Sequence, residues 1–100
     1  MTSTISLVRH RVADFDAWKK AYDGFATLRQ QGGIIGHAVN RVVGNDKLVL
    51  VYHQAETRAA LEAFLGSSDL KAGMQQAGVD ADSVQISYFD EVEAGTLVGV

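Results

Sequence analysis

Three histidines, at positions 10, 37 and 53, are the side chains of this sequence best suited to proton transfer. Imidazole titrates near neutral pH, so it can accept or donate a proton at cellular pH. His10 is the first candidate for a catalytic base, because it shares its phase with Val8 and Val12 on one strand face. His53 is the second candidate, although we expect both His53 and His37 to be exposed near sheet margins. Without chemistry, His10 would simply be held by a backbone or carboxylate partner.

A row of large aromatic side chains follows the first histidine at helical spacing. The residues are Phe15, Trp18, Tyr22 and Phe25. This spacing predicts a helix face that packs in the core. The same face can line a substrate pocket, since pockets are mostly apolar with a few orienting polar atoms. In that case Trp18 stacks on a planar ring, and the Tyr22 hydroxyl orients a phenolic or quinone oxygen.

Four further residues complete the predicted binding wall. Arg29 either holds a carboxylate or enolate oxygen or acts only as a cation near the negative end of a helix. Tyr52 and His53 are strand neighbours that point to opposite faces, so at most one of them enters a pocket. Phe64 and Met74 belong to the apolar side of a second helical region, and Met74 can adapt its shape to a ligand.

Motifs for metals and redox cofactors are missing from the sequence. Cysteine is absent, and no histidine pair or Glu-x-x-His motif has the spacing of helical metal ligands. Neither Gly32-Gly33 nor the segment 95–99 stands between a strand and a helix in the order that a dinucleotide fingerprint requires. We therefore expect no bound metal and no redox cofactor.

Length and composition predict one globular domain over residues 1–100. The chain is 47% hydrophobic and 21% charged, which are ordinary values for a folded domain. Nine basic residues against 12 acidic ones give a net charge of −3, which argues against a nucleic-acid partner. Residues 1–4 lack signal-peptide features, and no apolar run is long enough to span a membrane. We expect a cytoplasmic protein without a membrane partner.

Hydrophobic periodicity predicts the elements that position these side chains. Asp14, Thr57 and Ser67 or Ser68 are candidate helix caps, and glycines at 32–33 and 78 are candidate helix ends. The predicted elements are a strand over 5–12, a helix over 14–31, strands over 34–43 and 47–54 joined by a turn at 44–46, helical segments between 57 and 78 with a break at 66–68, and a strand over 83–92.

This order predicts an α+β domain of the ferredoxin-like βαββαβ type. Its antiparallel sheet has strand order 4-1-3-2, and helices cover one face. The other face still carries apolar residues, so we expect a homodimer that buries sheet against sheet. The apolar tail over 95–100 is predicted to pair with the partner's sheet edge, and Gly73 marks a candidate mobile segment above the cleft.

The sequence resembles small proteins of the dimeric α+β barrel superfamily. The residues that carry this resemblance are segment 8–19, Arg29 with Gly32-Gly33, and segments 64–65, 68–71 and 74–79. Within that superfamily it resembles the antibiotic biosynthesis monooxygenase-like and polyketide cyclase-like proteins. The resemblance implies a dimer whose two sheets form a barrel, with a small-molecule cleft between sheet and helices in each subunit. Haem-degrading members ligate iron from a helix, and the predicted helices here contain no histidine.

Two classes of function follow. The first is an enzyme without metal or flavin that acts on an aromatic or polyketide-like substrate, as a cyclase or as a cofactor-independent monooxygenase. In the cyclase version His10 is the base, and Arg29 or a tyrosine stabilises the enolate. In the monooxygenase version the pocket deprotonates a phenol, and the electron-rich substrate itself reacts with dioxygen. The second class is a non-catalytic dimer that binds a small ligand or serves as a scaffold, and the scarcity of clear acid–base pairs favours it.

Overall fold

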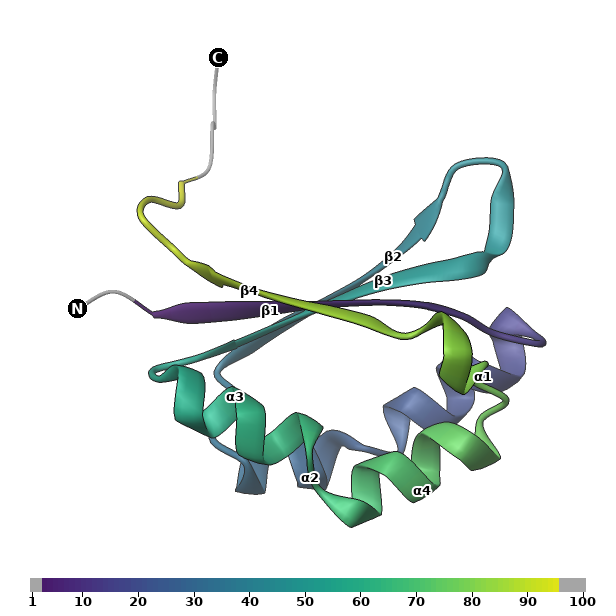
Figure 1. Cartoon of the computed structure of the whole chain (residues 1–100), viewed down its shortest axis with the longest axis horizontal. Helices are drawn as coiled ribbons and strands as arrows, with labels where there is room; N and C mark the ends of the chain where they lie inside the picture. Colours follow the sequence, from purple (N-terminus) through teal and green to yellow (C-terminus); the bar gives the residue numbers. More distant parts are fainter. Residues whose placement is uncertain (1–2, 96–100) are drawn as a thin grey trace.

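One antiparallel sheet with strand order β2-β3-β1-β4 organises the chain (Figure 1). The computed structural model describes residues 3–95. In chain order the elements are β1 (Thr4–Arg11), α1 (Phe15–Asp23), α2 (Ala26–Gln31), β2 (Gly36–Val42), β3 (Asn45–Ala55), α3 (Arg58–Leu65), α4 (Ser68–Gln76), the 3₁₀-helix η1 (Ala81–Ser83) and β4 (Gln85–Asp90). The predicted α+β, ferredoxin-like class and the predicted strand order are both confirmed.

The two faces of the sheet differ because successive side chains point to opposite sides of a strand. All four α-helices lie on one side of the sheet (Figure 1). On that side β1 buries Val8 and His10, and β3 buries Val49 and Val51. His10 pairs with Val49 and Val8 with Val51, so these side chains form the floor beneath the helices. Within residues 3–95, no helix covers the opposite face.

Side-chain caps fix the start of three of the four α-helices in the described part of the chain. The Asp14 carboxylate accepts a hydrogen bond from the amide of Asp16. Thr57 Oγ1 accepts one from Ala60, and Ser67 Oγ accepts one from Leu70. These contacts satisfy first-turn amides that have no partner within the helix.

No helix among residues 3–95 has the length and apolar character needed to cross a bilayer.

The single helix predicted over 14–31 is wrong, because the chain forms two helices that meet at Gly24 and Phe25. The amides of Gly24 and Phe25 bond the carbonyls of Ala21 and Tyr22, three residues back, at 3.0 Å each. Glycine is a poor helix former, so the tighter turn ends α1 there. The break turns α2 so that Arg29 Nη1 reaches the Tyr22 carbonyl at 3.0 Å.

The other strands begin or end a few residues away from the predicted boundaries. β2 begins at Gly36, and β3 begins at Asn45 after a tight turn in which Gly44 takes a φ of 84°. The last strand is shorter than predicted, because Asp80 caps the 3₁₀-helix η1 immediately before it. The predicted pairing of the tail falls mostly on residues 96–100, which lie outside the described residues.

Gly73 has a packing role that its low helix propensity does not suggest. A Cβ at this position would lie 2.5 Å from two ring atoms of Phe25. The absence of a side chain therefore lets the Phe25 ring lie directly against α4. Phe25 comes from the junction of α1 and α2, so this contact joins the two halves of the helical layer.

Replacing Gly73 with alanine is expected to destabilise the protein by about 1–2 kcal/mol, since overpacking outweighs the roughly 1 kcal/mol gain in helix propensity. Urea unfolding followed by circular dichroism measures this. The additional substitution Phe25→Leu removes the clashing ring edge and should restore part of the loss. A stabilised Gly73→Ala variant would contradict the packing role.

Candidate active site

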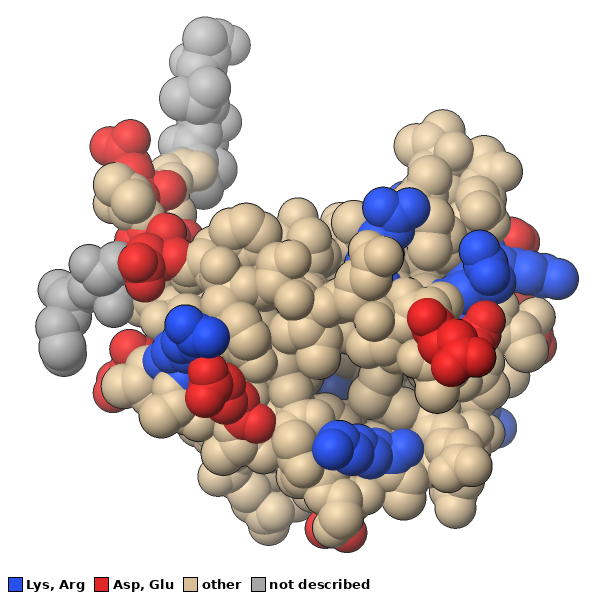
Figure 2. All heavy atoms as spheres, viewed as in Figure 1, with Lys and Arg blue, Asp and Glu red and all other residues tan. Residues whose placement is uncertain are grey.

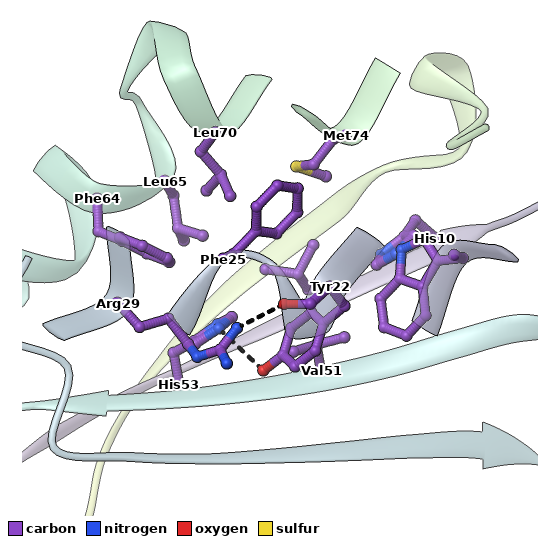
Figure 3. Close-up of a pocket in the computed structure, with 12 residues that line it drawn as sticks. His10, Tyr22, Phe25, Arg29, Val51, His53, Phe64, Leu65, Leu70 and Met74 are labelled. Atoms are coloured by element: carbon purple, nitrogen blue, oxygen red, sulfur yellow. Dashed lines mark hydrogen bonds between the residues drawn. The ribbon is translucent and has the colours of Figure 1, made fainter. Parts of the chain in front are cut away.

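A small cavity lies between the sheet and the helical layer (Figure 3). Its volume of about 30 Å³ is close to that of one water molecule. The lining residues come from β1, β3 and all four α-helices: Val8, His10, Trp18, Tyr22, Phe25, Arg29, Val51, His53, Phe64, Leu65, Leu70 and Met74. The structure therefore brings together every predicted site residue except Tyr52.

His10 is a buried base on the central strand β1, as its phase predicted. The residue is only 2% exposed, and its ring lies 5.5 Å from the Trp18 ring, centroid to centroid. Neither ring nitrogen has a hydrogen-bond partner within residues 3–95. Burial lowers the pKa of His10 from 6.5 to about 4, because the charged imidazolium loses its hydration, and a smaller effect of the nearby Val8 backbone acts in the opposite direction. At neutral pH the ring is therefore uncharged and able to accept a proton.

His53 was expected to be exposed, and that expectation is wrong. It is 5% exposed, because α3 places the Phe64 ring against it with ring centroids 5.2 Å apart. Its pKa is also lowered to about 4, first by burial and then by the charges of Arg29 and His37. Its Nδ1 has no hydrogen-bond partner among the described residues. The position of His53 near the end of a strand did not indicate that α3 would cover it.

The two buried histidines lie at different ends of the cavity (Figure 3). His53 pairs with Ser6, which lies four residues from His10 along β1. Four residues of strand span about 13 Å. The two imidazoles therefore face different parts of the cavity.

Tyr22 connects the His53 end of the cavity to a third histidine. Its hydroxyl lies 2.9 Å from His37 Nδ1 and 3.5 Å from His53 Nε2. Burial raises the pKa of Tyr22, with a smaller opposing effect of the Arg29 charge. The hydroxyl therefore keeps its proton at neutral pH. His37 is exposed, as expected, and its bond to Tyr22 was not foreseen.

Arg29 takes the structural role predicted for it, as a cation at a helix end, and it also lines the cavity. Its guanidinium carbon lies 4.3 Å from the centre of the Tyr22 ring, and Nη1 donates to the Tyr22 carbonyl at the end of α1. This bond places a cation at the negative end of that helix. Arg29 also lines the cavity, where the lining residues include no carboxylate. An anion formed in this space would face a fixed positive charge.

The cavity adjoins a larger groove between α4 and the β4 edge of the sheet. The groove has a volume of about 560 Å³ and shares Val8, Leu65 and Met74 with the cavity. Figure 2 shows the surface hollowed between the sheet and the helical layer. The three shared side chains form the partition between groove and cavity. Met74, with its flexible thioether chain, is the member of this partition most able to move aside.

Tyr52 does not belong to this cavity. It neighbours His53 on β3 and therefore points to the uncovered face, where it is 37% exposed. Its predicted place in the substrate-binding wall is corrected accordingly. Four cavity residues were missing from the predicted site: Val8, Val51, Leu65 and Leu70. The phase of His10 and His53 could have indicated the two valines, since each shares its strand face with one of these histidines.

Among residues 3–95, no three His, Asp or Glu side chains are placed to share a metal ion. The separation of His10 and His53 follows directly from the strand register. Tyr22, His37 and His53 do come together, as a chain of hydrogen-bonding groups around one hydroxyl.

The whole fold matches that of solved proteins. SnoaB, a cofactor-independent oxygenase from Streptomyces nogalater, has a TM-score of 0.73 at 13% identity, covering 99% of this chain and 100% of that chain. A protein from Caulobacter crescentus CB15, provisionally named an antibiotic biosynthesis monooxygenase, has a TM-score of 0.73 at 20% identity over 92% of each chain. This chain has the antibiotic biosynthesis monooxygenase-like fold.

The resemblance drawn from the sequence is thus confirmed at the level of the fold. A protein of unknown function from Nitrosomonas europaea shares the antibiotic biosynthesis monooxygenase-like fold equally well, with a TM-score of 0.73 at 16% identity over 99% of this chain and 98% of that chain. Comparison with family models and with curated proteins found no match. At these identities the likeness concerns the fold alone.

The buried histidines predict that stability falls as the pH falls from about 6.5 to 4. Each has a lowered pKa in the folded state, about 4 against 6.5, so the unfolded chain binds more protons in this window. Each should cost about 3 kcal/mol of unfolding free energy by pH 4.

Urea unfolding at pH 7 and pH 5, followed by the fluorescence of the single tryptophan, measures the part of this loss present at pH 5, about 2 kcal/mol for each histidine. The variant His10→Gln lacks one of the two titrating groups and should show a smaller difference between the two pH values. An equal difference in the variant would mean that His10 does not titrate as its burial requires.

Proposed function

We propose that this chain is a cofactor-independent oxygenase that removes a proton from an electron-rich phenol or from its activated ring methylene. The observation that carries the proposal is His10, a buried, uncharged imidazole on the cavity wall whose two nitrogens have no hydrogen-bond partner within residues 3–95. Leaving buried polar atoms unpaired costs stability, and such atoms are common where a ligand supplies the missing partner.

The low pKa of His10 suits a proton transfer that creates an ion pair. A free imidazolium is unfavourable in this apolar space, as the pKa of about 4 indicates. When the proton comes from a bound phenol or methylene, an anion forms next to the imidazolium and the pair is stabilised in a site with little water. His10 thus accepts a proton chiefly from a ligand that becomes negative.

Arg29 supports the same chemistry from the other end of the cavity. Its position above the Tyr22 ring is held by the bond to the Tyr22 carbonyl. A delocalised anion spreads its charge over several ring positions, so a cation distant from the reacting carbon still stabilises it. Trp18, beside His10, offers a flat surface on which an aromatic ring can stack.

The volumes indicate how a substrate would be placed. A ring system does not fit a space of about 30 Å³, whereas the adjoining groove of about 560 Å³ accommodates one. We expect the body of the substrate to occupy the groove and its reacting edge to pass the partition formed by Val8, Leu65 and Met74. Phe25 and Phe64 would then contact its apolar surface.

The reaction balances without an external reductant. The substrate anion transfers one electron to dioxygen, the resulting radicals combine into a carbon–oxygen bond, and the peroxide takes a proton from the His10 imidazolium. Loss of the second methylene hydrogen and of hydroxide then gives a ketone and water. One ring methylene and one dioxygen molecule become one carbonyl group and one water molecule. The substrate supplies all four electrons.

The neighbours in fold favour oxygenation over the alternatives, since one of them is a cofactor-independent oxygenase. A cyclase would use the same base to form a carbon–carbon bond and would consume no dioxygen. A non-catalytic ligand-binding dimer would bind the aromatic compound without any turnover.

Dioxygen uptake with 1,8-dihydroxyanthrone tests this proposal. This phenolic ketone has a ring methylene whose anion is strongly delocalised, and conversion to the quinone consumes one dioxygen molecule. We expect turnover above the spontaneous rate and a loss of about 10²-fold to 10⁴-fold in kcat for His10→Gln. Lys20→Gln, an exposed change on α1, serves as the control with unchanged rate.

Binding without dioxygen uptake would refute the oxygenase and favour a binding dimer. The anthrone is already cyclised and cannot report a cyclase. Cyclisation of an open-chain aromatic polyketone without dioxygen uptake would favour a cyclase. Full activity of His10→Gln would remove His10 from the mechanism.

A homodimer formed through the uncovered sheet face is part of the proposal. This face carries Ile5, Leu7, Leu48 and Leu50, together with Tyr52 at 37% and Phe89 at 47% exposure. An apolar face of this kind is unfavourable in water. Successive side chains of each strand point to opposite faces of the sheet. A second copy packed against the uncovered face therefore leaves the histidine cavity, which lies on the other face, unchanged.

Leu7→Lys is expected to break this association, because it places a charge at the centre of the face without entering the cavity. Light scattering after gel filtration should show the wild type at twice 10.8 kDa and the variant at 10.8 kDa. A wild type that is monomeric at micromolar concentration would contradict the dimer.

A further inference from the structure

The Tyr22 hydroxyl stands between two histidines that differ sharply in burial. It lies 2.9 Å from Nδ1 of the exposed His37. It also lies 3.5 Å from Nε2 of His53, which is 5% exposed (Figure 3). His37 and His53 face each other across the pairing of β2 with β3. One hydroxyl thus links a buried imidazole to an imidazole at the surface.

A second hollow lies on the outer side of this contact. It has a volume of about 260 Å³ and is lined by His37 and Arg29, among residues of α2 and the start of β2. Arg29 lines the inner cavity as well. The barrier between cavity and surface is therefore about one side chain thick at this point, and Tyr22 provides the polar group within it.

We infer that His53, Tyr22 and His37 form a proton relay between the inner cavity and the surface hollow. When a ligand gives a proton to His53 Nδ1, His53 Nε2 passes its own proton to the Tyr22 oxygen. Tyr22 gives its hydroxyl proton to His37 Nδ1, and His37 Nε2 releases one to water. Each atom gains one proton and gives one away, and the reverse sequence delivers a proton to the cavity.

The electrostatics of the cluster favour relay over storage of a proton. Burial and the nearby Arg29 charge keep the pKa of His53 at about 4, so His53 does not retain an extra proton. Burial also raises the pKa of Tyr22, and Asp23 acts in the same direction while Arg29 opposes it. The hydroxyl remains both donor and acceptor, as a relay requires.

His10 provides a matched comparison within the same protein. It is as buried as His53, its pKa is lowered to the same value of about 4, and it lies on the same sheet face. It has no hydrogen-bond partner among residues 3–95. A proton on His10 must wait for a local opening of the structure, whereas a proton on His53 has a route to the surface.

The relay rests on the proposed function for its use in catalysis, but its existence is measured without a substrate. Exchange of the histidine ring N–H protons with water is followed by nitrogen-edited NMR of the ¹⁵N-labelled protein at neutral pH. We expect the His53 proton to exchange at least about tenfold faster than the His10 proton, whose exchange is limited by local opening.

Tyr22→Phe and His37→Phe each interrupt the relay, the first inside the barrier and the second at the surface. In both variants the His53 rate should fall to that of His10, while the His10 rate stays unchanged. The His10 rate also reports any general loosening of the fold. Equal rates for the two histidines in the wild type, or a His53 rate that neither variant lowers, would overturn the relay.

The dioxygen assay separates this inference from the proposed function. Fast His53 exchange without dioxygen uptake retains the relay and removes the oxygenase. Normal dioxygen uptake with slow His53 exchange retains the oxygenase and removes the relay.

Discussion

The pairing of β1 with β3 is the constraint on which the candidate site depends. Side chains alternate along both strands, and the register His10 with Val49 and Ser6 with His53 directs both histidines under the helices. A shift of one residue in either strand would turn its histidine to the uncovered face. The hydrophobic contacts that fix this register, above all Val8 against Val51, therefore also place the two bases.

The helical layer shields both histidines from water. Trp18 covers His10, Phe64 covers His53, and Arg29 closes the space above Tyr22. Removal of water keeps the imidazoles uncharged and leaves nitrogens unpaired, which costs folding free energy. Sites where a ligand completes the hydrogen bonding are where such a cost is commonly retained. The same dryness would strengthen the interaction of a bound anion with Arg29.

Much of the fold could be predicted from the sequence because its signals are local. The caps at Asp14, Thr57 and Ser67 and the alternation in β1 depend on residues close in the chain. The break at Gly24 was missed, because the aromatic spacing continues through it as if α1 had not ended. The exposure assigned to His53 was wrong, because its burial depends on Phe64, a residue of a later helix.

The sequence by itself determined the order of the elements, the strand phase that turns His10 inward and the aromatic composition of the first helix. These follow from periodicity, which is a property of neighbouring residues. Only the tertiary structure decided that His53 is buried, that Tyr52 faces away and that the Tyr22 hydroxyl meets two histidines. Burial and hydrogen bonding between distant residues arise when the sheet register and the turn between α1 and α2 fix their relative positions.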